Sequence, residues 1–380
     1  MLNLSRFERY RELIDDWDAF SDALHRPLPA CMWTNTLRTT PRVLSEWLER
    51  CGVAHAPLSW LPEAFVIHDP EHAHALGATF PYLAGLGHVQ EEVSLIPSFL
   101  LGATRGERVL DTCAAPGGKT VHIAIQMDNA GTVVANDKSY QRLRAVRSIS
   151  NRLGVFNIAM TNIDACNMPN AMGRFDRALV DVPCSCEGTS RKNHGVLEDQ
   201  TNPEVFARVQ RRILARALKL LRPGGRLVYS TCTYAPEENE LVLQRVLSEF
   251  GWERARIISP DRELAGLRLT PGLTTWRGEE LHPDMARTLR VWPHHNDTGG
   301  FFVAVLERVL DDDHAQVIER AFDPHTHDAH LEPEAEHWEK VRQWFGLGDR
   351  WEGARRIYRS NTRLLSLVHT PHEPPTKPAP

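Results

Sequence analysis

The sequence predicts an α/β protein whose central sheet is parallel and covered by helices on both faces. From residue 91 onward, short apolar stretches typical of buried strands alternate with amphipathic stretches typical of helices. A glycine-rich turn joins the first of these strands directly to a helix, and such sheets bind ligands at the carboxyl ends of their strands. The length of 380 residues leaves room for two or three domains.

Five strands and five helices follow one another in this region. The helices are expected over residues 93–101, 120–127, 139–153, 203–221 and 237–250. The strands are expected over residues 108–111, 131–137, 156–161, 176–182 and 226–232. The sequence Arg-Pro-Gly-Gly at 222–225 should end the fourth helix. Residues 252–308 predict the antiparallel end of the same sheet, with its last strand over 301–306.

The flanking regions predict smaller units. Residues 1–90 indicate a small α+β module, in which Thr40 caps a helix that starts at Pro41. Residues 309–337 are acidic and contain proline, so we expect a linker. Residues 338–380 indicate a short C-terminal extension, with a helix near 338–345, a strand near 364–368 and a disordered tail.

The net charge of -5 hides an uneven distribution. Residues 311–339 hold ten acids and one base, so the remainder sums to about +4. Two stretches, 138–163 and 205–236, carry lysines and arginines but no acids, and they predict either a surface for phosphate backbones or solvated helix faces. No apolar run is long enough for a membrane span or a signal segment, so we expect a cytoplasmic protein with reduced cysteines. We also expect a monomer.

The glycine-rich turn has the sequence DTCAAPGGKT at 111–120. A phosphate-binding P-loop requires glycine six residues before the lysine, where this chain has Cys113, and the dinucleotide fingerprint G-x-G-x-x-G is absent. A purely structural turn remains one alternative. The other is a cofactor loop, in which small residues let the backbone approach a ligand closely.

Acidic residues at the strand ends favour the cofactor loop. Asp137 follows Gly117 by twenty residues and ends the second strand, where a carboxylate accepts hydrogen bonds from ribose hydroxyls. Asp164 follows the third strand and Asp181 ends the fourth. Three carboxylates around a glycine turn suit a cationic cofactor with an unphosphorylated ribose, and sulfonium methyl donors have this character.

Two cysteines are expected at the same edge of the sheet. Cys232 ends the fifth strand, and Cys184 follows the fourth. Inert packing is one explanation for a buried cysteine, and nucleophilic catalysis is another. Cys186 forms a C-x-C pair with Cys184, but no second pair stands at zinc spacing, and two histidine clusters at 68–74 and 325–330 lie in expected loops. We therefore expect no metal site.

These motifs together resemble the Sun-type RNA (cytosine-5) methyltransferases. The resemblance rests on DTCAAPGGKT, Asp137, Asp164, Asp181-Val182-Pro183-Cys184-Ser185 and Ser230-Thr231-Cys232, and it covers roughly residues 30–308. It implies a Rossmann-like class I methyltransferase fold with a mostly parallel seven-stranded sheet, an RNA-binding module over 1–90 and a catalytic domain over 91–308. The chain departs from the family at Cys186, where a glycine often stands.

The resemblance also implies roles for individual residues. Cys232 would add to carbon 6 of a cytosine, and Cys184 would assist release of the product. S-adenosylmethionine would be bound by Cys113, Ala114, Ala115, Pro116, Gly117, Gly118, Lys119, Asp137, Arg142, Asp164 and Asp181. Pro183 would shape the base pocket, and Arg191 and Lys192 would contact RNA.

The order of parts is most similar to the bacterial RsmF-type branch, which modifies small-subunit ribosomal RNA. Residues 338–369 resemble the start of that branch's C-terminal extension. Two alternatives stay open, namely the same chemistry on transfer RNA and a ribosome-assembly factor that binds RNA without catalysis. A methyltransferase of other chemistry, such as amine methylation, would leave the two strand-end cysteines without a role.

Overall fold

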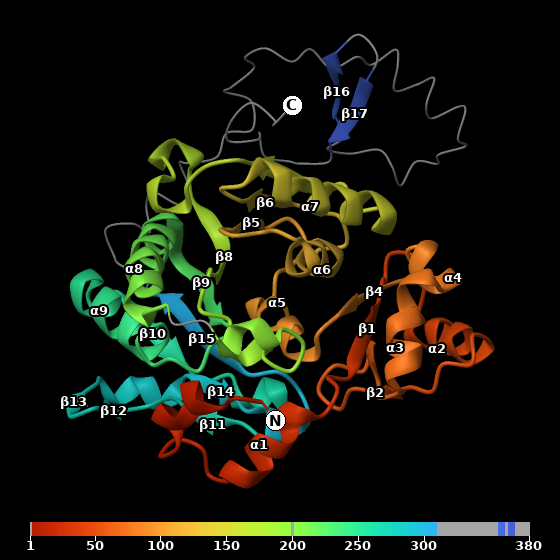
Figure 1. The fold of residues 1–380 in the computed structure, drawn as a ribbon. Helices are drawn as coiled ribbons and strands as arrows, with labels where there is room; N and C mark the ends of the chain where they lie inside the picture. Colours follow the sequence, from red (N-terminus) through yellow and green to blue (C-terminus); the bar gives the residue numbers. More distant parts are fainter. Residues whose placement is uncertain (1, 199–200, 310–355, 362–363, 369–380) are drawn as a thin grey trace.

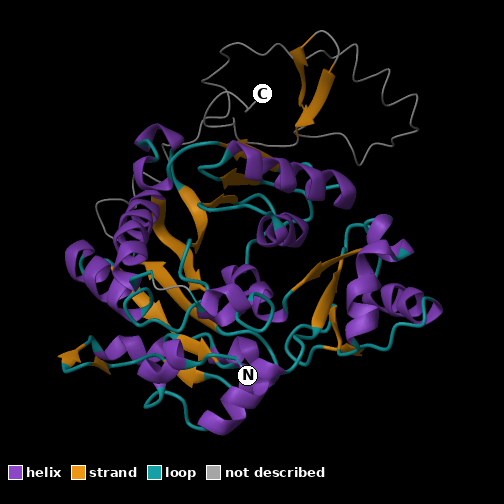
Figure 2. Ribbon diagram, viewed as in Figure 1, coloured by secondary structure: helices purple, strands orange, loops and turns teal. Residues whose placement is uncertain are grey.

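The computed structural model describes residues 2–198, 201–309, 356–361 and 364–368. Its main feature is a nine-stranded sheet with helices on both faces, which confirms the predicted fold class (Figures 1 and 2). Five parallel strands form the centre in the order β7-β6-β5-β8-β9. Their bounds are Ile158–Thr161, Thr132–Asn136, Arg108–Asp111, Phe175–Asp181 and Leu221–Thr231.

The antiparallel end of the sheet is longer than expected. Strand β15 (Phe301–Arg308) pairs with β9, and its other edge pairs with two strands, β14 (Leu289–Val291) and β10 (Ala255–Ile258). A short strand, β11 (Thr270–Pro271), then pairs with β14. The sheet has nine strands instead of the seven expected. The eight-residue β15 accommodates β14 and β10 at its two ends, and β11 extends the edge beyond β14.

Alternating side chains of the central strands face two separate cores. Leu110 and Val180 pack with α8 (Pro203–Leu220) and α9 (Glu240–Phe250) on one face. Val109 and Leu179 pack with α5 (Ile96–Leu101) and α6 (Gly118–Gln126) on the other. Helix α7 (Tyr140–Leu153) lies beside α6 and covers the β6 end (Figure 1). Such two-faced burial explains why these strands are apolar throughout.

Helix α8 ends at Leu220, one residue before its predicted end, but the Arg-Pro-Gly-Gly sequence that follows lies inside the long strand β9. Gly224 has a φ of +73°, and the pairing of β8 with β9 shifts register at this point. The turn signal thus marks an irregularity in a strand, because glycine permits a left-handed residue without breaking the sheet.

A second, four-stranded antiparallel sheet lies within residues 30–90 and has the order β2-β3-β1-β4. Its strands are Ala56–Pro57, Ala64–Ile67, Ala30–Thr34 and Gly87–Gln90, and its helices are α2 (Pro41–Arg50), α3 (Pro70–Ala75) and α4 (Phe80–Leu83). The predicted cap of α2 is confirmed, since Thr40 accepts a hydrogen bond from the Val43 amide and Pro41 is the first helical residue.

Residues 2–25, the described part of the N-terminal segment, do not pack on this small sheet. The 3₁₀ turn η1 (Ser5–Tyr10) and helix α1 (Trp17–His25) lie against the antiparallel end of the large sheet (Figure 1). Phe7, Tyr10 and Phe20 form a buried aromatic cluster with Tyr234 and Trp292. The chain therefore contacts the large sheet both before and after the small one.

The described part of the C-terminal region is one hairpin. Strands β16 (Arg356–Asn361) and β17 (Leu364–Val368) pair antiparallel, which confirms the predicted strand over 364–368. The predicted helix near 338–345, the linker from residue 310 and the tail lie outside the described residues. Within the described ranges, no helix combines the length and the apolar character needed to cross a membrane.

Candidate active site

The glycine-rich turn of residues 113–119 connects β5 to α6 at the carboxyl edge of the sheet and includes the first two residues of α6. Gly117 has a φ of +120°, and a Cβ atom there would lie 2.9 Å from the Cα of Val146 in α7. The turn therefore requires glycine both for its backbone and for close packing. Directly beneath it, the Thr120 hydroxyl donates to Asp111 at 2.7 Å, and burial raises the pKa of Asp111 to about 7.

Asp137 joins this turn to the end of β6. Its carboxylate accepts hydrogen bonds from the backbone amides of Ala115 at 3.2 Å and Ser139 at 2.8 Å. Arg142 lies 3.4 Å from the Asp137 carboxylate and donates to the Ala115 carbonyl at 2.7 Å. Asp164 follows β7 at the same edge. The structure thus brings the predicted cofactor residues to one edge, with Arg142 supporting the loop from its exposed side.

Asp181 lies at the centre of the site. Its carboxylate forms an ion pair with Lys119 at 2.8 Å and accepts a hydrogen bond from the Ser230 hydroxyl at 2.7 Å. Burial opposes the charged form of Lys119, but the attraction of Asp181 outweighs it and raises the pKa of the lysine. The glycine-rich turn, β8 and β9 are therefore linked by one carboxylate.

The two predicted cysteines are in contact. The sulfur atoms of Cys184 and Cys232 lie 3.4 Å apart, and that of Cys186 lies 4.0 Å from Cys184. Contacts with Cys186 and Cys232, together with burial, hold the pKa of the Cys184 thiol well above its usual range. For Cys232, contact with Cys184 lowers the pKa, but contact with Cys186 and burial outweigh it and raise the pKa well above the usual value.

A buried carboxylate holds the loop after β8 in place. Glu238 accepts hydrogen bonds from the Ser185 amide at 3.0 Å and the Gln210 side chain at 2.9 Å. Gln210 also donates to the Pro183 carbonyl at 2.9 Å, so the residue predicted to shape the base pocket is anchored by α8. Burial raises the pKa of Glu238 to about 7.

Glu187 holds the other side of the same loop. It is buried, and it accepts hydrogen bonds from Arg6 at 2.9 Å, Tyr10 at 2.9 Å and Thr233 at 2.9 Å. The first residues of the chain therefore contact the cysteine loops directly. Sequence reasoning missed Glu187 and Glu238. No local signal distinguishes Glu238, because it stands among the polar residues Glu237, Asn239 and Glu240.

The predicted RNA contact of Arg191 is wrong. Its side chain is 1% exposed, and its guanidinium donates to the carbonyls of Pro27 at 2.6 Å and Thr298 at 3.0 Å and pairs with Asp297 at 2.8 Å. Arg191 therefore ties together three segments of the protein. Lys192 is 60% exposed and lies 3.7 Å from Glu91, so it stays accessible.

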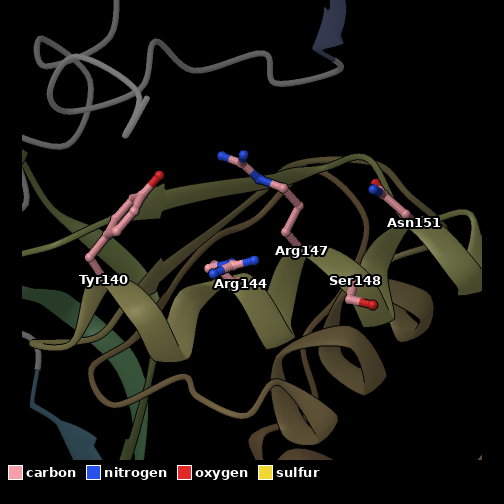
Figure 3. A pocket seen from close by; sticks show the side chains of 5 residues that line it. All are labelled: Tyr140, Arg144, Arg147, Ser148 and Asn151. Carbon is pink, nitrogen blue, oxygen red and sulfur yellow. The ribbon is translucent and has the colours of Figure 1, made fainter.

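Most arginines of the two acid-free stretches also hold the protein together. Arg152, for example, donates to the Gly87 carbonyl at 3.1 Å, and Arg216 donates to Asn170 at 2.7 Å. Arg144 and Arg147 instead line an open groove of about 540 Å³ along α7, together with Tyr140, Ser148 and Asn151. Figure 3 shows Tyr140 and Arg147 projecting from the same side of this helix. The basic surface is thus narrower than the sequence suggests.

Residues 98–307 match the family model described as 16S rRNA methyltransferase RsmB/F. The chain is 35% identical over 311 residues to the ribosomal RNA small subunit methyltransferase F of Erwinia tasmaniensis, which covers 80% of this chain and 62% of that protein. It is 34% identical over 296 residues to the human 28S rRNA (cytosine(4447)-C(5))-methyltransferase, covering 76% of this chain and 35% of the relative.

A further relative is matched over nearly its whole length. The tRNA (cytosine(49)-C(5))-methyltransferase of Pyrococcus abyssi is 32% identical over 310 residues, which cover 81% of this chain and 96% of that protein. Among solved structures, a methyltransferase homolog protein from Pyrococcus horikoshii superposes with a TM-score of 0.66 at 33% identity, covering 77% of this chain and 90% of that one. The chain spans between about a third and three fifths of the two ribosomal RNA methyltransferases.

Proposed function

The chain belongs to the 16S rRNA methyltransferase RsmB/F family, and we propose on this basis that it transfers a methyl group from S-adenosylmethionine to carbon 5 of a cytosine in RNA. The observation that carries the proposal is the contact between the Cys184 and Cys232 thiols, 3.4 Å apart. They lie at the carboxyl ends of adjacent strands, beside the Asp181–Lys119 ion pair. An amine methyltransferase has no use for two such thiols.

The chemistry explains why a thiol is needed. Carbon 5 of cytosine is a poor nucleophile, but a thiolate that adds to carbon 6 converts the ring into an enamine-like nucleophile. We assign this addition to Cys232. After methylation, the proton on carbon 5 leaves and the sulfur–carbon bond breaks, which restores the aromatic ring and the thiolate. We assign assistance in this release to Cys184.

The raised pKa of Cys232 means that its proton must be removed when substrate is bound. A cationic sulfonium bound beside Cys232 would lower the thiol pKa by electrostatic attraction. Lys119 also interacts electrostatically with Cys232, but its charge is paired with Asp181, whose carboxylate raises the pKa of Cys232. The thiolate is therefore favoured only in the loaded site, which limits reaction with other electrophiles.

The residues at the sheet edge fit S-adenosylmethionine. The turn of residues 113–119 consists mainly of small residues, and the carboxylates of Asp137 and Asp164 follow the next two strands. We propose that these groups bind the ribose and adenine, and that Asp181 lies between the cofactor and the base. The bound cofactor supplies the methyl group. Pro183 and Lys192, together with the α7 groove, are proposed to contact RNA.

We propose small-subunit ribosomal RNA as the substrate, because the family model and the Erwinia relative carry that description. Transfer RNA is the second candidate, because the chain covers 96% of the archaeal tRNA methyltransferase. Bisulfite sequencing of RNA from cells with and without the gene separates the two. Loss of a methylated cytosine from small-subunit RNA supports the first, and loss from transfer RNA supports the second.

The chemistry is tested by trapping. RNA containing 5-fluorocytidine is incubated with the protein and S-adenosylmethionine, and denaturing electrophoresis detects a covalent adduct. Fluorine cannot leave carbon 5 as a proton, so the adduct should accumulate with the wild type and not with Cys232→Ala. Cys51→Ala, which changes an exposed cysteine, is the matched control and should form the adduct normally. No adduct with total cellular RNA would contradict the covalent mechanism.

A further inference from the structure

Three cysteine thiols gather at the active site, although the reaction proposed above uses two. Cys186 lies 4.0 Å from Cys184 through their sulfur atoms, and all three sulfur atoms, including that of Cys232, lie within 4.8 Å of one another. The sequence spacing did not predict this group, because Cys232 stands 46 residues beyond the C-x-C pair and joins it only through the sheet.

The spacing of the sulfur atoms matches a metal site. A Zn²⁺ ion binds thiolates at about 2.3 Å in tetrahedral geometry, which separates two sulfur ligands by about 3.8 Å. The observed separations of 3.4 Å and 4.0 Å lie on either side of this value. Three soft sulfur ligands favour zinc and similar thiophilic ions over Mg²⁺ or Ca²⁺. Water would complete the tetrahedron.

The cluster of three sulfur atoms is accessible to an ion, and a lysine lies near the negative charge that the loaded site would carry. Cys186 and Cys232 are partly exposed, so the cluster is open from the side where the substrate base is proposed to bind. Three thiolates around a divalent cation carry one net negative charge, and Lys119 interacts electrostatically with Cys232. Cys186 has a φ of +58°, a conformation that favours glycine, so the backbone gives no reason for a cysteine at this position.

We propose that Cys184, Cys186 and Cys232 form a binding site for a thiophilic divalent cation such as Zn²⁺. On binding, three thiols release their protons to solvent as three sulfur–zinc bonds form, and no electrons are transferred. The bound ion is coordinated by the sulfur of Cys232. Cys232 therefore cannot add to cytosine until the ion is removed. This inhibition rests on the proposed function, whereas the metal site itself does not.

The metal site is tested without RNA or cofactor. The reduced, metal-free full chain is titrated with Cd²⁺, and the ultraviolet sulfur-to-metal charge-transfer band is recorded. Zn²⁺ affinity is then measured by competition with a chromogenic chelator. We expect one ion per chain and an affinity at least tenfold weaker in Cys186→Ser. Cys186→Gly provides a second variant, because glycine is at ease at a φ of +58° and a folding defect would not explain its loss of binding.

Two controls locate the ion. Cys51→Ser changes an exposed cysteine, and Asp15→Asn disrupts the contacts with His294 and His295, which form a second group of possible ligands. Both should bind as the wild type does. Wild-type affinity in Cys186→Gly, or absence of the charge-transfer band, would overturn the metal site. If the band is present but excess Zn²⁺ leaves 5-fluorocytidine trapping unchanged, the inhibitory role is wrong.

Discussion

At the scale of single residues, the contact between the thiols of Cys184 and Cys232 predicts two separable defects. Cys232→Ala should form no adduct with RNA, because the atom that adds to cytosine is gone. Cys184→Ala should form an adduct that persists with ordinary RNA, and turnover should fall on the order of 100-fold, as when one proton-transfer group is lost. Gel analysis with radiolabelled methyl donor measures both. If Cys184→Ala turns over normally, its assigned role in release is wrong.

Glu238 makes a prediction about pH. Burial raises its pKa to about 7, whereas a glutamate in an unfolded chain has a pKa of about 4.3. The folded state keeps a proton that the unfolded state loses in this interval, so the stability contributed by the protonated form is present at low pH and lost as the pH rises. Between about pH 5 and pH 8, the wild type should therefore lose about 1–3 kcal/mol of unfolding free energy through this group. Glu238→Gln is neutral at every pH and should not show this loss.

Urea unfolding across this pH range measures the difference between Glu238→Gln and the wild type. Glu249→Gln, on the exposed face of α9, is the matched control and should follow the wild type. If the free energies of unfolding of Glu238→Gln and the wild type change in parallel with pH, the carboxyl is not protonated in the folded state.

The residues that sequence reasoning identified at the site are those whose chemistry appears in a local motif. Cys232, Asp137 and the turn of residues 113–119 each stand at the end of a recognisable strand. Arg191 was misassigned, because a sequence shows a positive charge but not the carbonyls that surround it. Burial of an arginine depends on segments far away along the chain, and no local pattern reports it.

At the scale of elements, a buried ion pair joins β14 to α9. Arg290 donates to Glu240 at 2.7 Å, and their side chains are 3% and 0% exposed. Arg290→Met should lower the free energy of unfolding by about 3–5 kcal/mol, because Glu240 would keep a charge inside the protein without a partner.

The pair Arg256–Glu307 is the matched control for this ion pair. It joins β10 to β15 at 2.9 Å, but Arg256 is 63% exposed, so Arg256→Met should cost no more than about 1 kcal/mol. Urea unfolding of both variants gives the comparison. Equal losses would mean that burial does not decide the strength of these pairs.

The order and type of the elements could be predicted because their patterns are local. Alternation of apolar and amphipathic stretches identified β5, β6, β8 and the helices between them. The two-residue strand β11 and the three-residue strand β14 carry no such pattern. Pairing makes them strands rather than their own sequence, since β14 pairs with β15 and β11 pairs with β14. Residues 222–225 differ, because their turn signal corresponds to the point where the pairing of β8 with β9 shifts register.

At the scale of the whole molecule, the first residues of the chain precede the small sheet in sequence but pack on the large one. Arg6 and Tyr10 reach Glu187, 181 and 177 residues away in the sequence. Sequence patterns place both residues in the N-terminal region but cannot show that they support the cysteine loops. Contacts of this length depend on how the two sheets are joined, which the local patterns do not contain.

The groove along α7 predicts how RNA binding depends on salt. Each phosphate contact on single-stranded RNA contributes about -0.7 to the slope of log K against log salt concentration. If Arg144 and Arg147 each contact one phosphate, the variant with both changed to glutamine should bind RNA more weakly at low salt, with a slope shallower by about 1.4. Arg105→Gln is the control, because Arg105 is an exposed arginine just before β5 that does not line the groove. Fluorescence anisotropy with a labelled RNA fragment at several salt concentrations measures the affinity of all three proteins.

An unchanged slope in the double variant would mean that the RNA backbone binds elsewhere on the molecule. Lys192 would then be the next candidate, since it lies on the loop that carries the cysteines.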